Sequence, residues 1–292
     1  MDLATAAFVA HRNLLFTVAY EMLGSAADAE DVLQETWLKW SGVELDEVRE
    51  PRAYLVRVTT RQALMRLRSL KRRKEDYVGP WLPAPLLTAP DVAENVELAE
   101  SVSTAMLLVL ETLSPTERAV FVLREVFALG YEEIAAAVEK SPAAVRQIAH
   151  RARGHVAARR PREQVTSHAA QDALDAFRRA VETGDLQGLL DKLAPDVVML
   201  TDAGGVKQAV LEPIVGVAQV RPFLELAVPS LRSIGSVEPV QVNGHPALIV
   251  RIGDELDGVL SVRIDEGLIT GLYFVRNPEK LSHVGQETVV SR

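Results

Sequence analysis

The chain has 292 residues, 48% of them hydrophobic and 25% charged, and a formal net charge of −8. This length and composition predict a soluble globular protein with two or three domains, and they exclude a repetitive or low-complexity chain. The absence of cysteine excludes disulfides and thiolate metal sites and is consistent with a reducing cytoplasm. The first apolar stretch, residues 4–22, is interrupted by His11, Arg12 and Asn13, so it predicts neither a signal peptide nor a membrane span.

The net charge conceals two strongly basic segments. Residues 49–74 contain ten Lys or Arg and a single acid, Glu50, and residues 141–162 contain six Arg and no acid. The remainder of the chain is therefore strongly acidic. Two basic segments in an acidic chain predict two places that meet phosphate, with the rest free to contact proteins.

The N-terminal part predicts two helices in succession. Residues 3–22 form an apolar helix that stops at Gly24, and Ser25 is the expected N-cap of a helix that runs to Trp40. Acids crowd the first turn of this second helix, where the helix dipole favours them. A stripe of larger side chains follows: Val32, Leu33, Thr36, Trp37 and Trp40. The stripe is interpreted either as core or as a docking face for a partner helix.

A third helix is predicted from Arg52 to Lys74, after a loop over residues 41–51. One sector of its helical wheel is occupied by Leu55, Val58, Gln62 and Met65, and another sector is cationic. The cationic sector consists of Arg57, Arg61, Arg68, Lys71 and Arg72. Because no acid shares it, repulsion among the cations is unrelieved unless an anion binds. The alternatives are a solvated face and a DNA-backbone contact, and the pattern favours the second.

Residues 79–90 predict a linker. They contain four prolines around Trp81 and Leu82, and proline fixes φ and removes hydrogen-bond donors, which favours an extended chain. The sequence Trp-Leu-Pro-Ala-Pro is too apolar for a solvated tether, so we expect it to pack on another part of the molecule. Residues 91–112 then predict one amphipathic helix.

The next segment has the order of a helix-turn-helix. Ser114 to Glu117 form a capping box with proline at the first helical position, so a helix is predicted over 115–128 with Gly130 as its stop. Short helices at 131–139 and 141–153 follow, separated by a tight turn.

The helix at 141–153 begins with a cap at Ser141 and Pro142. Val145, Ile148, Ala149 and Ala152 form one buried stripe. The opposite face carries only hydrogen-bond donors: Arg146, Gln147, His150, Arg151 and Arg153. A helix anchored on one side and cationic on the other suits a DNA groove.

Beyond a polar break at 161–167 the pattern becomes that of an α+β domain. Helices are expected at 168–183, up to Leu193 and at 217–227, with a strand at 197–200. Four alternating runs follow, at 237–242, 246–252, 258–265 and 268–276. The dipeptides Asn243-Gly244, Asp257-Gly258 and Glu266-Gly267 predict the turns of antiparallel hairpins. We therefore expect a curved sheet with helices on one face.

Several of these motifs, in this order, resemble the extracytoplasmic-function (ECF) sigma factors of bacterial RNA polymerase. Residues 28–37 are similar to the polymerase-binding helix of that family, residues 51–68 to the helix that engages the −10 promoter element, and residues 113–153 to the domain that reads the −35 element. Three further segments resemble a subgroup with a fused SnoaL-like domain: Trp81-Leu-Pro-Ala-Pro85, Asp202-Ala-Gly-Gly-Val-Lys207 and Asn277-Pro-Glu-Lys-Leu281. In the second of these, Ala203 and Val206 depart from the usual Asp-Gly-Gly-Gly-Lys.

The resemblance implies a multidomain fold. Two all-α sigma domains, the second a helix-turn-helix, precede an α+β SnoaL-like cone-shaped domain with a curved, mostly antiparallel sheet. The implied boundaries are a region 2 domain at 1–78, a linker at 79–110, a region 4 domain at 111–160, the SnoaL-like domain at 166–281 and a tail at 282–292. The implied function is that of an alternative sigma factor, cytoplasmic and without catalysis, cofactor or metal, whose activity the C-terminal domain modulates.

The resemblance also implies partners and site residues. Contacts to the −35 element are expected from Ala143, Ala144, Arg146, Gln147, His150, Arg151 and Arg153, and contacts to the −10 element from Arg52, Arg57, Arg61 and Arg68. The clamp helices of the polymerase β′ subunit are expected to meet Asp28, Glu30, Asp31, Glu35 and Trp37. Regulatory contacts are expected from Trp81, Pro83, Asp202, Lys207, Asn277, Pro278, Glu279, Lys280 and Leu281. A small ligand of the C-terminal domain is a further possible partner, and no membrane is implied.

Two other functions remain open from the residues alone. One is a one-component transcription regulator, in which the C-terminal domain senses a ligand. The other is a cyclase or isomerase fused to DNA-binding helices, with Asp202, His245 and Asp254 as an acid/base set. A histidine beside Asn-Gly and Pro is more often a turn residue, so the sequence favours a regulatory role for this domain.

Overall fold

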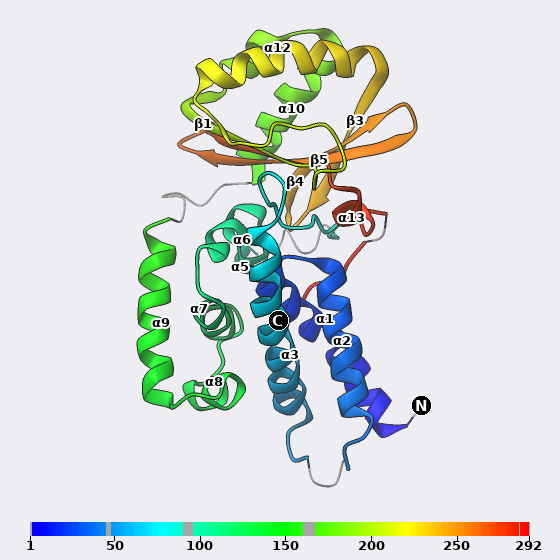
Figure 1. Ribbon diagram of the computed structural model, residues 1–292. Helices are drawn as coiled ribbons and strands as arrows, with labels where there is room; N and C mark the ends of the chain where they lie inside the picture. Colours follow the sequence, from blue (N-terminus) through cyan, green and yellow to red (C-terminus); the bar gives the residue numbers. More distant parts are fainter. Residues whose placement is uncertain (1, 45–47, 90–95, 160–166, 286, 292) are drawn as a thin grey trace.

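We describe the protein from a computed structural model, in which residues 2–44, 48–89, 96–159, 167–285 and 287–291 are described (Figure 1). Three groups of elements follow one another along the chain: three N-terminal helices, a second helical group and an α+β domain. The two helical groups lie side by side, and the α+β domain lies across one end of both (Figure 1). None of the helices in the described ranges combines the length and apolar character that a membrane span requires.

The N-terminal group consists of α1 (Leu3–Leu23), α2 (Ala26–Trp40) and α3 (Pro51–Glu75). The side chain of Ser25 accepts a hydrogen bond from the Asp28 amide and caps α2, as predicted. Gly24 ends α1 with a φ of 66°, and a Cβ at this position would lie 2.8 Å from Cη2 of Trp81. Glycine is therefore required here both for the left-handed backbone and for the close approach of the linker.

The buried side of α3 differs from the predicted sector. Leu55, Ala63 and Leu67 are buried, whereas Val58 is half-buried and Met65 is 53% exposed. The reason is that α3 packs between two neighbours, with α1 and α2 on one side and α7 and α8 on the other. Its buried surface is consequently wider than one stripe and is rotated relative to the wheel.

The second helical group contains α5 (Val96–Val102), α6 (Thr104–Glu111), α7 (Pro115–Phe121), the π-helix η2 (Val122–Val126), α8 (Tyr131–Val138) and α9 (Pro142–Ala157). The capping box at Ser114 and Glu117 is present, and Ser141 caps α9 through the Ala144 amide. The two helices of the helix-turn-helix, α8 and α9, therefore begin where the sequence predicted, but α9 runs to Ala157, about one turn beyond the predicted end at Arg153.

Two predictions in this group were wrong. The single helix expected over 91–112 is interrupted because Ser103 caps a new helix, α6, through the Met106 amide; residues 91–95 lie outside the described ranges. The stop of the helix expected over 115–128 is Ala128, with a φ of 53°. Gly130 instead has a φ of −66° and precedes α8, whose Glu133 accepts a hydrogen bond from the Gly130 amide.

The α+β domain contains α10 (Ser167–Thr183), α11 (Leu186–Leu190), β1 (Leu193–Asp202), β2 (Ile214–Val215), α12 (Val217–Ile234), β3 (Gly235–Val242), β4 (His245–Ile252), β5 (Glu255–Asp265), β6 (Leu268–Val275) and α13 (Pro278–Leu281). The strand order is β2-β1-β6-β5-β4-β3. Only the β1–β6 pair of this order is parallel, so the expected mostly antiparallel sheet is confirmed.

One predicted turn was wrong. The chain turns at Asn243-Gly244 and Glu266-Gly267, where φ is positive, but Asp257 and Gly258 lie inside β5. The reversal between β4 and β5 instead occurs at Gly253, with a φ of 56°. Gly258 is needed for packing, because a Cβ there would lie 2.6 Å from the Phe274 ring on the adjacent strand.

Both faces of the sheet are covered. Leu248, Val250 and Leu260 point to the face packed by α10, α11 and α12. Ala247, Ile249 and Val259 alternate with them and point to the other face, where they pack with linker residue Leu82 and with Leu108 of α6. The second face is thus covered by the helical part of the molecule. This explains the unbroken apolar run in β4, which is typical of a strand buried on both sides.

The two helical groups share one apolar core. A continuous cluster of buried side chains runs from Phe8 of α1 to Val156 of α9, and it includes Leu86 of the linker and Val290 near the C-terminal end. The end of the chain passes back between the helices, next to α1 and α3 (Figure 1). The Ser291 amide donates a hydrogen bond to Oγ1 of Thr17 in α1. The last described residues therefore contribute to the shared core and bind α1.

Candidate functional site

The outward face of α9 carries the predicted −35 contacts. Arg146, Gln147, His150, Arg151 and Arg153 are all exposed, while the expected stripe of Val145, Ile148, Ala149 and Ala152 is buried. At the N-terminus of the helix, Ala143 is exposed and Ala144 is half-buried. The face is therefore accessible to a large anionic partner.

Acids from the preceding helices reach the edge of this face. Arg153 pairs with Glu125 of η2 at 3.0 Å, Arg151 lies 3.9 Å from Glu117 of α7, and Arg146 lies over the ring of Tyr131. The sequence pattern of α9 did not reveal these acids because they come from other elements. Exposed ion pairs contribute about 0–1 kcal/mol, so a phosphate can replace them at little cost.

The predicted −10 contacts lie along α3 but are not equally free. Arg52 and Arg68 are exposed, and Arg57 lies over the ring of Tyr54. Arg61 donates a hydrogen bond from Nη2 to the carbonyl oxygen of Ala136 at 3.0 Å and lies 3.4 Å from Glu139. Ala136 belongs to α8 and Glu139 follows it, so one predicted DNA contact of the first helical group is bound by the second.

The acidic face of α2 is partly neutralised by neighbouring arginines. Arg66, which the sequence analysis overlooked, pairs with Asp28 at 2.7 Å and with Asp31 at 2.5 Å, and Arg12 pairs with Glu30 at 2.8 Å. Glu35 is exposed, as is the apolar side chain of Leu38, at 71%. Trp37 packs edge-on against Phe8 and is half-buried. The helical wheel had not singled out Leu38, which lies exposed beside these acids.

A cluster of polar contacts around Asp202 ties the α+β domain to the linker, and we call it the Asp202 anchor. The Asp202 carboxylate is fully buried and accepts hydrogen bonds from the Tyr77 hydroxyl at 2.6 Å, the Leu82 amide at 2.7 Å and Nζ of Lys280 at 2.6 Å. Lys280 also donates to the Leu82 carbonyl and lies 4.0 Å from the centre of the Trp81 ring. Burial, together with the hydrogen bond to Asp202, raises the pKa of Tyr77.

The glycine loop after Asp202 supports this anchor. The left-handed positions of the loop are Gly204 and Gly205, so Ala203 and Val206 occupy positions that do not require glycine. A Cβ on Gly204 would lie 2.4 Å from Nδ2 of Asn277, which donates a hydrogen bond to the Tyr77 hydroxyl. Gly204 therefore allows Asn277 to reach the anchor.

The other residues predicted to make regulatory contacts divide into two sets. Pro83 and Leu281 are buried beside the anchor's residues, whereas Pro278 and Glu279 are exposed and form the first turn of α13, which Asn277 caps. Lys207 binds within the α+β domain, where it pairs with Asp257 at 3.2 Å. Asp257 in turn pairs with Arg276 at 2.8 Å.

A second cluster, the Asn243 anchor, was not predicted. Asn243, at the tip of the β3–β4 hairpin, is 1% exposed and donates hydrogen bonds from Nδ2 to the Tyr20 hydroxyl at 2.7 Å and the Val102 carbonyl at 2.8 Å. Its Oδ1 accepts from the Leu86 amide at 2.9 Å, and the Tyr20 hydroxyl donates to the Ala84 carbonyl at 2.6 Å. Burial raises the pKa of Tyr20. One side chain thus joins the α+β domain to α1, the linker and α5.

A buried arginine adds a direct link between the helical groups. Arg118 of α7 is 1% exposed, donates from Nε to the Glu21 carbonyl of α1 at 3.0 Å and pairs with Glu111. Buried arginines are rare unless they are paired. A capping-box sequence gives no signal of burial at the residue that follows it, so this contact was not foreseeable from the sequence.

The possible acid/base set is not assembled. Asp202 ends β1 and His245 begins β4, and two strands separate them, which accounts for about 14 Å across the sheet. The register adds to this distance, because Asp202 lies level with Ile249, four residues along β4 from His245. His245 bonds through Nε2 to the Ala99 carbonyl at 3.2 Å. Asp254 lies beyond the other end of β4, in the turn to β5. These three residues hold separate structural positions and cannot act on one substrate atom.

Comparisons with known proteins agree with this arrangement. The family models "Sigma-70 region 2" and "Sigma-70, region 4" match residues 7–73 and 103–156. The chain is 32% identical over 290 residues to the ECF RNA polymerase sigma factor SigJ of Mycobacterium tuberculosis, covering 94% of this chain and 92% of that protein. It is also 32% identical to the probable ECF sigma factor SigI of the same species, covering 98% and 97% of the two chains.

A solved structure resembles the whole chain. The crystal structure of SigJ from M. tuberculosis superposes with a TM-score of 0.76 at 29% identity, covering 96% of this chain and 98% of that one. The similarity therefore extends over the linker and the α+β domain as well as the two helical groups.

Proposed function

This chain belongs to the ECF RNA polymerase sigma factors, and we propose that its two helical groups bind promoter DNA and core RNA polymerase while its SnoaL-like domain controls when they can do so. The expectation of an alternative sigma factor is confirmed by the relatives, and the one-component regulator is set aside. Below, α1–α3 are called region 2 and α6–α9 region 4.

In this proposal α9 enters the major groove of the −35 element. Arg146, Gln147, His150 and Arg151 are its exposed donors, and Arg and Gln suit bidentate contacts to guanine and adenine. The helix N-terminus at Ala143 and Ala144 faces phosphate oxygens. Arg52, Arg57, Arg61 and Arg68 of α3 meet the −10 element, where a flipped or unpaired base must be held.

The polymerase contact is assigned to α2. Its exposed Glu35 and Leu38, with the paired acids Asp28, Glu30 and Asp31 and the half-buried Trp37, form a mixed acidic and apolar face. Such a face suits the basic clamp helices of the β′ subunit, the partner that the family implies.

The regulatory part of the proposal is supported by contacts that hold the linker and the −10 surface in place. The SnoaL-like domain binds the linker at Leu82 and at Leu86, and region 4 binds Arg61 of the −10 surface. Two promoter elements lie apart along DNA, so contacts to both require regions 2 and 4 to separate. We infer that this closed form is the resting state and that opening it permits promoter binding.

The test is transcription by core RNA polymerase from a library of random upstream sequences, with and without the full chain. We expect transcripts that start downstream of a shared pair of motifs only when the protein is present. Gln147→Ala with His150→Ala should weaken selection at the −35 motif by about tenfold or more. The matched control is Arg159→Ala, an exposed arginine beyond α9, which should leave the motif unchanged. Absence of protein-dependent transcripts would overturn the proposed function.

A further inference from the structure

The SnoaL-like domain contains a cavity that the contacts to the sigma regions do not use. It lies between the sheet and helices α10 and α12, on the face opposite the linker, and its volume is about 190 Å³. An apolar cavity of about 150 Å³ is large enough to bind benzene. The space therefore accommodates one substituted aromatic ring or a short alkyl chain.

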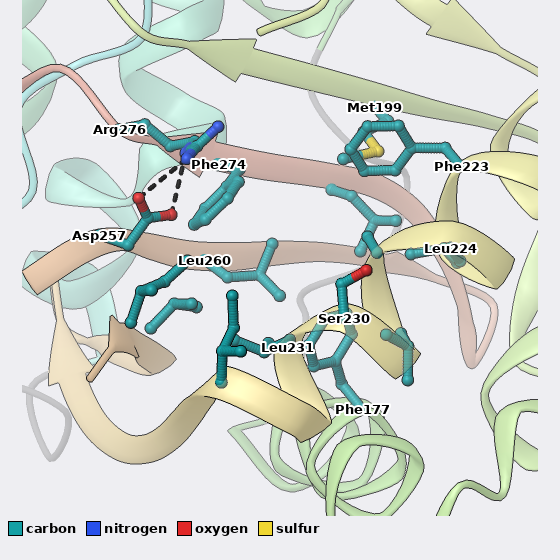
Figure 2. Close-up of a pocket in the computed structure, with 16 residues that line it drawn as sticks. Phe177, Met199, Phe223, Leu224, Ser230, Leu231, Asp257, Leu260, Phe274 and Arg276 are labelled. Carbon is teal, nitrogen blue, oxygen red and sulfur yellow. Dashed lines mark hydrogen bonds and ion pairs between the residues drawn. The ribbon is translucent and has the colours of Figure 1, made fainter. Parts of the chain in front are cut away.

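The lining of the cavity is almost entirely apolar, with one charged end. Phe177, Met199, Phe223 and Leu272 supply apolar surface, and Asp257 and Arg276 supply the charges. Figure 2 shows the Asp257–Arg276 ion pair at one end and Met199 and Phe223 at the other. A third polar side chain, Ser230, donates its hydroxyl hydrogen to the Leu226 carbonyl within α12. A ligand would thus be recognised by its apolar body and by one polar end.

The charged end has an excess of positive charge. Asp257 accepts hydrogen bonds from Nε and Nη2 of Arg276 at 2.9 and 2.8 Å and from Lys207 at 3.2 Å, so two cations share one carboxylate. Burial opposes the ionisation of Asp257, but Arg276 and Lys207 outweigh it and keep the pKa of that carboxyl below its usual range. The acid is therefore ionised at neutral pH, and the cluster retains one net positive charge.

Arg276 also has N–H groups beyond those that bind Asp257. Its Nη1 donates a hydrogen bond to the Gln208 carbonyl at 2.7 Å. Among the described residues, Asp257 and Gln208 thus engage three of the five N–H groups of a guanidinium. A carboxylate is a stronger acceptor for the remaining N–H groups than a neutral group is.

We propose that this cavity binds a small carboxylic acid with an apolar body, an aromatic or short-chain monocarboxylate, whose carboxylate meets the guanidinium of Arg276. The binding site stands independently of the proposed function. Only the consequence for transcription rests on that function.

The position of Arg276 gives such a ligand a route to the linker. The Arg276 and Asn277 amides both donate hydrogen bonds to the Asp202 carbonyl, at 2.6 and 2.9 Å. Asp202 holds the linker through its carboxylate, and Asn277 caps α13, which carries Lys280. A carboxylate that draws Arg276 toward the cavity therefore acts on the chain segment that forms the Asp202 anchor. Arg276, which would bind the effector, lies four residues before Lys280, which binds Asp202.

The binding test uses the full chain and isothermal titration calorimetry with four probes: 3-phenylpropanoate, octanoate and the amides of both. We expect one site per chain for at least one acid, and a dissociation constant at least tenfold weaker for its amide. Failure of both acids to bind at millimolar concentration, or equal binding of acid and amide, would overturn the proposal.

Two variants locate the site. Ala227→Phe fills the cavity from α12 and should abolish binding, whereas the matched control Leu226→Phe adds the same ring at the adjacent position, which is 74% exposed and outside the cavity, and should bind normally. Unchanged binding by Ala227→Phe would contradict the assigned site.

The same acid is then added to the transcription reaction. A change in output that Ala227→Phe loses and Leu226→Phe keeps supports control of the sigma factor by the ligand. If the acid binds but transcription does not change, the ligand does not control the sigma factor, although the binding site is still established. Calorimetry also detects binding at the site if the protein directs no transcription. The two hypotheses therefore fail separately.

Discussion

Two polar anchors hold the linker to the SnoaL-like domain, and they differ in chemistry and in what they join. The Asp202 anchor is charged, centred on Asp202 and Lys280, and binds the linker at Leu82. The Asn243 anchor is neutral and binds the linker at Leu86, but it also reaches α1 through Tyr20 and α5 through Val102. The Asp202 anchor holds the linker and Tyr77, which follows α3, whereas the Asn243 anchor joins the linker to α1 of region 2 and to α5, which precedes region 4. Cutting each anchor separately therefore tests which one keeps the molecule closed.

The largest effect is expected from Asp202→Ala. Removing one partner of a buried ion pair costs about 3–5 kcal/mol, and here it takes the carboxylate away from Lys280. Lys280 is partly reached by solvent, so the lower figure is expected for the free energy of unfolding, measured with urea. The double variant with Lys280→Met removes both charges and should recover part of the loss. A double variant no more stable than Asp202→Ala would show that the ion pair is not the source of the anchor's stability.

A smaller effect is expected from Asn243→Ala. It leaves the Tyr20 hydroxyl, the Val102 carbonyl and the Leu86 amide without their partner, and an unsatisfied buried group costs about 1–3 kcal/mol. Glu266→Ala is the matched control, because Glu266 also has a positive φ before a glycine at a hairpin turn but is exposed. The two variants should differ by at least 1 kcal/mol, on the order of the cost of one unsatisfied group. Equal losses of unfolding free energy in the two variants would mean that the cost comes from the backbone of the turn and not from the hydrogen bonds of the Asn243 side chain.

The third largest effect is expected from acidification, which should weaken the Asn243 anchor. Burial lowers the pKa of His245, which follows this hairpin and bonds to the Ala99 carbonyl. The unfolded state then binds more protons than the folded state below the usual histidine pKa of about 6.5, so stability is full above that pH and falls as pH decreases. His245→Gln keeps a donor but does not titrate, so its unfolding free energy between pH 7 and pH 5.5 should fall less. Parallel curves for the two proteins would contradict this assignment.

The smallest effect on stability is expected from substitutions at the direct contact between regions 2 and 4, which does not involve the linker. The pair between Arg61 and Glu139 is exposed on both sides, and such pairs contribute about 0–1 kcal/mol. Glu139→Gln should therefore change the urea midpoint very little, while Arg61→Gln, which also loses the Ala136 carbonyl, should change it more. A large decrease in the urea midpoint of Glu139→Gln would mean that the direct contact between the sigma regions, rather than the anchors, stabilises the closed form.

The sequence predicted the Asp202 anchor better than the Asn243 anchor for a physical reason. Asp202, Lys280 and Trp81 lie in segments that resemble a subgroup of the family, so the resemblance singled out each residue before its partners were known. Asn243-Gly244 is a common hairpin turn, and its backbone requirement is the same whether its tip is exposed or buried. The partners of Asn243 are 141 and 223 residues away along the chain, at Val102 and Tyr20, and no local pattern carries that information.

The same distinction separates the correct and incorrect element boundaries. Caps are local, and Ser25, Ser114 and Ser141 begin their helices as predicted. Asp257-Gly258 has the composition of a turn, but its glycine is needed to accommodate Phe274 of the neighbouring strand. The exposed face of α9 was predictable from its own stripe, whereas the acids Glu117 and Glu125 beside it come from other helices.

The central claim is that regions 2 and 4 are closed at rest and separate on the polymerase. Because the natural chain has no cysteine, spin labels can be placed at Ala10→Cys on α1 and Ala157→Cys on α9, both exposed, and the distance between them measured by double electron–electron resonance. The free protein should give one narrow distribution, and the complex with core polymerase and promoter DNA should give a distinctly longer distance. Asp202→Ala and Asn243→Ala should populate the longer distance without polymerase. An identical distribution in the free protein and in the promoter complex would contradict the claim.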